Sequence, residues 1–127
     1  MFLGLRTIIY PAPNLAESKA WFTTLLEIEP YFDEDFYVGF SVNGYELALD
    51  PNADPARGPI TYWGVPDADA ALARLVAAGA EGDQAVTEVG DAIRVALVRL
   101  PHANGLLGVI ENPHFAAAAV DSPGPGR

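Results

Sequence analysis

Residues 7–14 read TIIYPAPN and residues 60–67 read ITYWGVPD, and these two segments decide the fold. Each begins with a run of β-branched and aromatic residues typical of a strand. Each ends on a proline followed by a good helix N-cap residue, Asn14 or Asp67. The two segments stand at a constant offset, because Thr7 corresponds to Ile60 and Asn14 corresponds to Asp67. A fixed offset of this kind indicates an internal repeat, which has to be recognised before a fold is assigned.

A helix pattern follows each copy. After Asn14, Glu17 completes a pattern that resembles a capping box. We expect one buried face on this helix, formed by Leu15, Trp21, Phe22, Leu25 and Leu26. The second helix opens around Asp67 and ends at Gly79, the residue type best able to take a left-handed conformation. Its apolar positions are Ala71, Leu72, Leu75 and Val76.

Strand candidates follow each helix and close on an Asn-Gly pair, at residues 43–44 and 104–105. Asn-Gly is the strongest short signal for a tight hairpin turn. The sequence therefore predicts two tandem βαβββ units, about residues 3–51 and 58–115, joined by a linker rich in Pro and polar residues. Together they form one α+β domain over residues 1–115, and we expect residues 116–127 to be a flexible tail.

Three short segments fall in a fixed order along the chain: YWGVPD at 62–67, AGA at 78–80 and NGLLGVIENP at 104–113. With the repeat, this ordered set resembles the vicinal-oxygen-chelate superfamily of glyoxalases, bleomycin resistance proteins and dioxygenases. The resemblance covers residues 3 to about 115. It implies that the two units form a cupped, eight-stranded mixed sheet with helices on the outer face and the ligand inside. It also implies a homodimer, with the units paired either within one chain or exchanged between chains.

Strand alternation then assigns side chains to the inside of the cup. If Asn43-Gly44 is a two-residue turn, one face of the hairpin is uniformly apolar and belongs against a helix. The other face belongs to the cup, and the same parity applies to the leading strand of each unit. The predicted ligand-binding pocket comprises Thr7, Ile9, Tyr37, Ser41, Glu46, Ala48, Asp50, Ile60, Tyr62 and Gly108.

Most enzymes of this superfamily hold a divalent metal in the cup. The resemblance places the four ligand positions at Thr7, Ala48, Ile60 and Gly108. Alanine, isoleucine and glycine bring no donor atom, and threonine is a poor ligand beside imidazole or carboxylate. His102 and His114 fall in turns outside the inner face, and Glu111 should face outward. We therefore expect no metal and no cofactor, with a weak magnesium site at Glu46 and Asp50 as the alternative.

Composition narrows the choice of partners. The net charge of −10 disfavours nucleic acid and is compatible with a cationic or aromatic small molecule. The chain has no cysteine, no apolar run long enough to span a membrane and no signal-peptide pattern. We expect a cytoplasmic protein with no membrane partner.

The first functional hypothesis is a metal-independent protein that binds a small molecule in the cup, such as a drug-sequestering protein. The alternative is a lyase, isomerase or dioxygenase of the same superfamily that uses carboxylates and tyrosines or an atypical metal site. A third is a regulatory or accessory subunit. The sequence identifies no catalytic residue, and the missing ligands make the usual metal-dependent activity the less favoured choice.

Overall fold

The computed structural model describes residues 1–102 and 105–114. It has the predicted α+β architecture, in which a strand, a helix and three strands occur twice. The first unit contains β1 (Gly4–Pro11), α1 (Leu15–Leu26), β2 (Phe32–Glu34), β3 (Tyr37–Val42) and β4 (Tyr45–Asp50). A short 3-10 helix, η1 (Pro55–Arg57), lies in the linker. The second unit contains β5 (Ile60–Gly64), α2 (Ala68–Ala77), β6 (Glu81–Glu88), β7 (Arg94–Arg99) and β8 (Leu106–Glu111).

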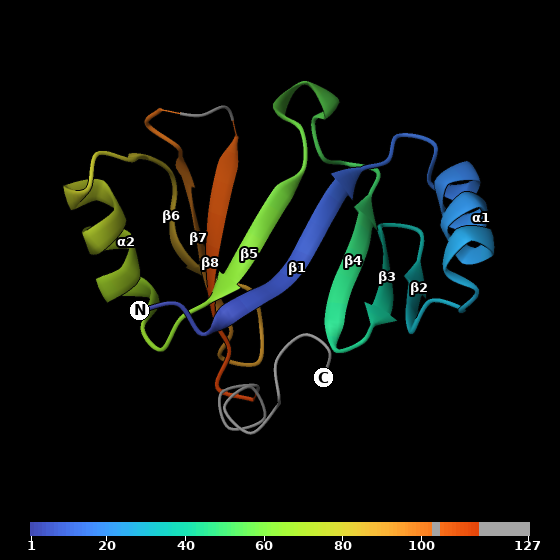
Figure 1. Ribbon diagram of the computed structural model, residues 1–127, viewed down its shortest axis with the longest axis horizontal. Helices are drawn as coiled ribbons and strands as arrows, with labels where there is room; N and C mark the ends of the chain where they lie inside the picture. Colours follow the sequence, from blue (N-terminus) through green and yellow to red (C-terminus); the bar gives the residue numbers. More distant parts are fainter. Residues whose placement is uncertain (103–104, 115–127) are drawn as a thin grey trace.

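All eight strands belong to one mixed sheet, in the order β2-β3-β4-β1-β5-β8-β7-β6. The two units meet where β1 and β5 pair antiparallel, and we call this pair the seam. Figure 1 shows the seam in the middle of the molecule, with α1 and α2 on opposite flanks. Both halves of the cupped sheet therefore come from one chain, and the homodimer stays a prediction. No helix in the described residues is long and apolar enough to cross a membrane.

The hairpin between β3 and β4 has the predicted register. Val42 pairs with Tyr45 and Ser41 with Glu46 around the two-residue turn. Asn43 and Gly44 both have positive φ, 52° and 89°, as a tight hairpin turn requires. In the second unit the corresponding turn includes Asn104, which lies outside the described residues.

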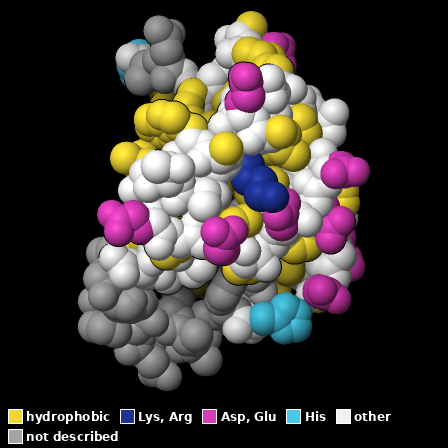
Figure 2. Space-filling model, turned by 90° about the vertical axis from the view of Figure 1, so that its right-hand side faces the viewer, with side chains coloured by type: hydrophobic (Ala, Val, Ile, Leu, Met, Phe, Trp, Pro, Cys, Tyr) yellow, Lys and Arg dark blue, Asp and Glu magenta, His cyan; other side chains and the backbone are white. Residues whose placement is uncertain are grey.

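Helix α1 packs on the first unit through a narrow stripe. Its N-cap is as predicted, because the Asn14 side chain accepts a hydrogen bond from the Glu17 backbone N–H. The core beneath it consists of Ala12, Val38, Phe40 and Leu49, against which Leu15, Phe22 and Leu26 pack. The prediction that Trp21 and Leu25 belong to the buried face of this helix is wrong, because their exposed fractions are 60% and 56%. Neither is among the residues that pack against this core. Figure 2, which views the molecule from the α1 side, shows hydrophobic patches among carboxylates.

Helix α2 is seated more deeply. Ala68 and Ala71 are buried, and Leu72 and Leu75 pack against a core of Val65, Ala71, Ala96 and Val109. Val76, the fourth apolar position of this helix, is 49% exposed. The helix ends as predicted, with Gly79 at a φ of 107° just beyond it.

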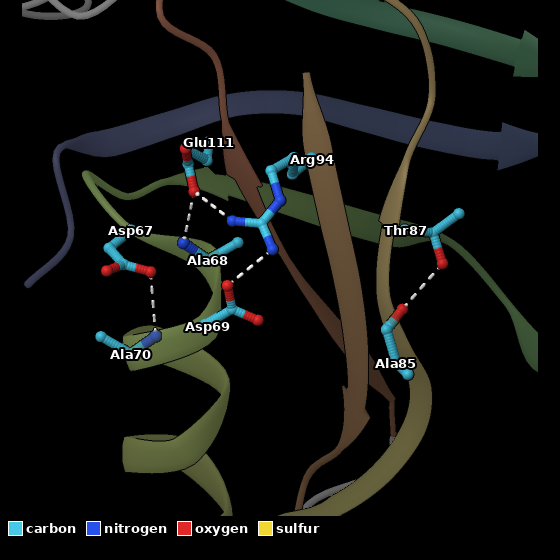
Figure 3. Close-up of polar contacts among 8 residues, drawn as sticks. All are labelled: Asp67, Ala68, Asp69, Ala70, Ala85, Thr87, Arg94 and Glu111. Carbon is cyan, nitrogen blue, oxygen red and sulfur yellow. Dashed lines mark hydrogen bonds and ion pairs between the residues drawn. The ribbon is translucent and has the colours of Figure 1, made fainter. Parts of the chain in front are cut away.

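A polar network fixes the start of α2 to the sheet (Figure 3). Glu111 Oε1 accepts hydrogen bonds from the Ala68 backbone N–H at 2.8 Å and from Arg94 Nη1 at 3.2 Å. Arg94 Nη2 also contacts Asp69 Oδ2 at 2.6 Å. The predicted outward direction of Glu111 is confirmed, because its carboxylate lies on the helix side of the sheet and accepts a hydrogen bond from the first residue of α2.

Candidate functional site

The inner face of the cup is organised as rows that cross several strands. In one row Thr7 pairs with Glu46 on one side and with Tyr62 on the other, and Tyr62 pairs with Gly108. In the next row Ile9 pairs with Ala48 and with Ile60. The predicted pocket residues of these four strands therefore share one face. Thr7 and Ile60 lie diagonally across the seam and are not direct partners.

Glu46 is the centre of a hydrogen-bonded cluster in the first unit. Its Oε1 accepts from Thr7 Oγ1 at 3.0 Å and from Tyr37 Oη at 2.9 Å. Its Oε2 accepts from the hydroxyl of Tyr31. These four residues come from β1, β3, β4 and the segment before β2, and we refer to them as the Glu46 cluster. A carboxylate has about four acceptor positions, so this one is nearly saturated by hydroxyl groups.

The cluster depends on a missing side chain at Gly39. A β-carbon at this position would lie 2.6 Å from Glu46 Oε2 and 3.1 Å from Tyr31 Cε1. Glycine therefore makes room for both the carboxylate and the tyrosine ring. Gly39 pairs with Ala48 in the adjacent strand, which also contributes little volume.

A second glycine, Gly108, makes room for an aromatic ring in the other unit. A β-carbon there would lie 2.5 Å from Tyr62 Cδ1 and 2.6 Å from Tyr62 Cε1. The Tyr62 ring thus covers the place from which a side chain at 108 would enter the cup. Any larger residue would have to displace this ring or approach the Thr61 carbonyl oxygen, 3.0 Å away.

These contacts show that the residues present do not fit the divalent metal that the fold family implies. Of the four positions carried over from the family, only Thr7 has a side-chain donor, and its hydroxyl is bonded to Glu46. Glu46 already accepts three hydrogen bonds, and Tyr62 fills the space above Gly108. Within residues 1–102 and 105–114, no three His, Cys, Asp or Glu residues are grouped so that they could hold a metal ion.

A groove opens beside the Glu46 cluster. It has a volume of about 380 Å³ and is lined by Tyr31, Phe32, Phe36, Tyr37, Asp50 and Asn52. We call it the aromatic groove. Phe32 makes edge contacts with both Phe36 and Tyr37, with ring centroids 6.0 and 5.9 Å apart. Tyr31 and Phe36 are 62% and 58% exposed, so their surfaces are accessible to a ligand.

The tyrosine hydroxyls in the cup keep their protons well above neutral pH. Burial, together with the hydrogen bond to Glu46 and its charge, raises the pKa of Tyr31 above its ordinary value. Burial followed by the charge of Glu46 raises the pKa of Tyr37 in the same way. Burial and the charge of Asp50 raise the pKa of Tyr62. All three side chains therefore act as neutral phenols.

The structure brings some of the predicted site residues into direct contact and leaves others apart. Thr7, Tyr37 and Glu46 are joined by hydrogen bonds, and Asp50 lies with Tyr37 on the aromatic groove. Tyr62 is stacked over Gly108. Ser41 pairs with Glu46 in register but is exposed. Ile9, Ala48 and Ile60 form the apolar row between these groups.

Sequence reasoning missed four residues that line the groove: Tyr31, Phe32, Phe36 and Asn52. A signal was present, because residues 31–37 read YFDEDFY and carry four aromatic rings in one short edge segment. His102 and His114 are exposed as expected, and His114 Nε2 lies 2.9 Å from the Asp91 carbonyl oxygen.

Comparison with known proteins identifies the fold. No family model matches the chain, and no curated protein matches its sequence. Among solved structures, a glyoxalase/bleomycin resistance protein/dioxygenase superfamily member from Vibrio splendidus is 16% identical, with 85% of this chain and 99% of that chain covered and a TM-score of 0.66.

Two further structures have the same fold. A variant of the Streptomyces coelicolor methylmalonyl-CoA epimerase, in complex with 2-nitronate-propionyl-CoA, is 14% identical; 89% of this chain and 99% of that chain are covered, with a TM-score of 0.70. An NAD-dependent benzaldehyde dehydrogenase from Legionella pneumophila is 18% identical; 84% and 97% are covered, with a TM-score of 0.67. At these identities the likeness establishes the fold alone, and the differing names show that the fold does not specify a reaction.

Proposed function

Since the chain has the glyoxalase/bleomycin resistance/dioxygenase fold, we propose that it binds a small organic molecule in the first half of its cup without the superfamily's usual metal. The ligand is an aromatic or cationic compound, and a drug-sequestering role is the finer form of this proposal. The aromatic groove supplies the binding surface, and the two tyrosines of the Glu46 cluster form part of its polar wall.

One observation carries this proposal. The Glu46 carboxylate accepts a hydrogen bond from Thr7, which stands at one of the family's four ligand positions, and two more from the hydroxyls of Tyr31 and Tyr37. A carboxylate held in this way organises its neighbours and has little capacity left for a cation in its own coordination sphere. The cluster therefore supports a recognition role for these residues and no role as metal ligands.

The groove has the properties of a small-molecule site. Ligand pockets are mostly apolar, with a few placed polar groups, and begin at about 300 Å³. Here Phe32 and Phe36 supply ring surface, while Asp50 supplies negative charge at the same groove. Aromatic faces and carboxylates both attract organic cations, and the net charge of −10 favours their approach.

The proposal is tested by ligand-induced thermal stabilisation with three probes of similar shape: phenethylammonium, 2-phenylethanol and 3-phenylpropionate. We expect the ammonium probe to raise the melting temperature, with the same rise in the presence of EDTA. Phe36→Ala should remove most of the shift because it deletes a groove wall. Phe2→Ala is the matched control, since Phe2 is also exposed but lies outside the groove.

Glu46→Gln sharpens this test. The glutamine amide keeps the shape of the side chain but replaces one acceptor oxygen with a donor, so it cannot accept all three hydroxyls. We expect about a tenfold loss of affinity for the ammonium probe by isothermal titration. Two results would overturn the proposal: a transition metal bound stoichiometrically and required for binding, or full affinity retained in Phe36→Ala.

A further inference from the structure

The hydroxyl groups beside the groove have a fixed hydrogen-bond polarity. An ionised carboxylate can only accept, so each hydroxyl that contacts Glu46 must direct its single proton toward it. Tyr31 and Tyr37 both make this contact, and both line the aromatic groove. Their donors are thus used within the protein, and what remains for a ligand is the lone pairs of the two phenol oxygens.

The raised pKa values of these tyrosines keep that polarity fixed. Burial and Glu46 hold both phenols in the protonated form, and a protonated phenol bonded to a carboxylate has no second proton to offer. The two oxygens therefore remain acceptors throughout the neutral pH range.

Asp50 adds a third acceptor to the same groove. Its Oδ1 accepts from the Asn52 backbone N–H at 2.8 Å, which orients the carboxylate, and Oδ2 accepts no hydrogen bond from the residues that the structure describes. The Asn52 side-chain amide can donate or accept, so it does not set the polarity of the groove. Tyr31, Tyr37 and Asp50 all belong to the six residues that line this cavity.

The geometry points to a specific ligand class: we propose that the aromatic groove selects a primary ammonium group attached to an aromatic or apolar body. This inference rests on the proposed function and names the chemistry of its ligand. A primary ammonium carries three N–H donors and matches an acceptor-rich wall, whereas a quaternary ammonium has charge but no donor. A carboxylate or phosphate meets lone pairs and the charge of Asp50, and is repelled.

Matched probes separate hydrogen bonding from charge. Phenethylammonium and (2-phenylethyl)trimethylammonium have the same ring, linker and charge, but three methyl groups replace the three N–H donors in the second. We expect the primary ammonium to bind about tenfold more tightly by isothermal titration, since hydrogen bonds to charged groups are the strong ones. 3-Phenylpropionate should show no measurable binding.

Asp50→Asn tests the third acceptor. The asparagine keeps the oxygen that can accept from the Asn52 backbone N–H, but it replaces the free acceptor with an amide donor and removes the charge. We expect the preference for the primary over the quaternary probe to fall several-fold. Asp54→Asn is the control, because Asp54 lies in the linker just after β4, accepts a hydrogen bond from the Ala56 backbone N–H and is not among the groove residues.

The outcomes distinguish this inference from the proposed function. Equal affinity for the two cations, or tighter binding of the quaternary one, overturns the primary-ammonium inference while the proposed binding function stands. Tightest binding of 3-phenylpropionate overturns the inference in the same way. Absence of binding for every probe in wild-type protein overturns the proposed function, and the inference with it. A preference that survives Asp50→Asn unchanged removes Asp50 from the site and overturns the three-acceptor arrangement.

Discussion

The two repeat units share one topology but differ in what they present to the inside of the cup. In the first unit the inner face carries Glu46, which accepts hydrogen bonds from Tyr37 and Thr7. In the second unit the paired rows carry Val95 and Leu97, which are only 7% and 6% exposed. The repeat thus provides a symmetric scaffold on which the hydrogen-bonded Glu46 cluster lies in the first unit. In the second unit Val95 and Leu97 present buried apolar side chains beside Tyr62.

The helices differ in the same sense. Helix α1 has no buried residue and begins at a local Asn14 cap. Helix α2 has two buried alanines, and its start is tied to β7 and β8 through Arg94 and Glu111. The helix of the first unit therefore has fewer buried residues and fewer polar contacts with the sheet than the helix of the second unit.

The largest effect should come from breaking the apolar inner face of the second unit. Leu97→Ala deletes most of a side chain that is 6% exposed and should lower the free energy of unfolding by about 2–5 kcal/mol. Ser41→Ala, on the exposed inner face of the first unit, should change it by less than about 0.5 kcal/mol. Urea denaturation measures both. Similar values for the two variants would remove the proposed division between the units.

A smaller difference in the free energy of unfolding should separate variants of the polar contacts that hold the start of α1 and the start of α2. Glu111→Ala leaves the Ala68 N–H and Arg94 Nη1 without an acceptor, while Arg94 Nη2 keeps its contact with Asp69, and it should cost about 2 kcal/mol. Asn14→Ala removes only a local cap and should cost about 1 kcal/mol. Glu111→Gln retains an acceptor oxygen and serves as the conservative control. If Asn14→Ala proved the more damaging variant, α1 would be the better anchored helix. Amide exchange at Ala68 reports the lost bond directly.

The smallest effect concerns alkaline pH and the Glu46 cluster. In the unfolded chain Tyr31 and Tyr37 lose their protons near pH 10, but their raised pKa values hold the protons longer in the folded state. Their contribution to stability is therefore complete below about pH 10 and is lost as the pH rises toward the folded pKa. Urea midpoints should decline less steeply above about pH 10 in the Tyr31→Phe, Tyr37→Phe double variant. An unchanged slope would contradict the role of these tyrosines.

Much of the fold could be predicted because its determinants are local and periodic. The pre-helix segments, the Asn43-Gly44 turn and Gly79 each specify backbone conformation within a few residues. Strand alternation then gave the inner face of β3 and β4, including the pairing of Ser41 with Glu46. What failed was the width of the buried face on α1, because contact with a curved sheet is a tertiary property that helix periodicity does not contain.

The site was predicted only in part, for a related reason. The Tyr31 side chain passes over Gly39 to contact Glu46, and the spacing of residues 31, 39 and 46 in the sequence does not predict this contact. The β-bulge between Leu5 and Thr7 was also invisible to simple alternation. It places the Arg6 guanidinium over Gly64, where a β-carbon would lie 3.0 Å from Arg6 Cζ. Both features depend on glycines that leave room for side chains from elsewhere in the chain.

The seam between β1 and β5 has a consequence for how the chain reaches this structure. Its partners, such as Gly4 with Gly64 and Ile9 with Ile60, are separated by roughly half of the chain. The hairpin at Asn43-Gly44 closes a very short loop, whereas the seam closes a long one and carries the larger entropic cost. We therefore expect the local contacts within each unit to form before β1 pairs with β5. The pairing of these two strands, which joins the two partly folded units, should be the rate-limiting step.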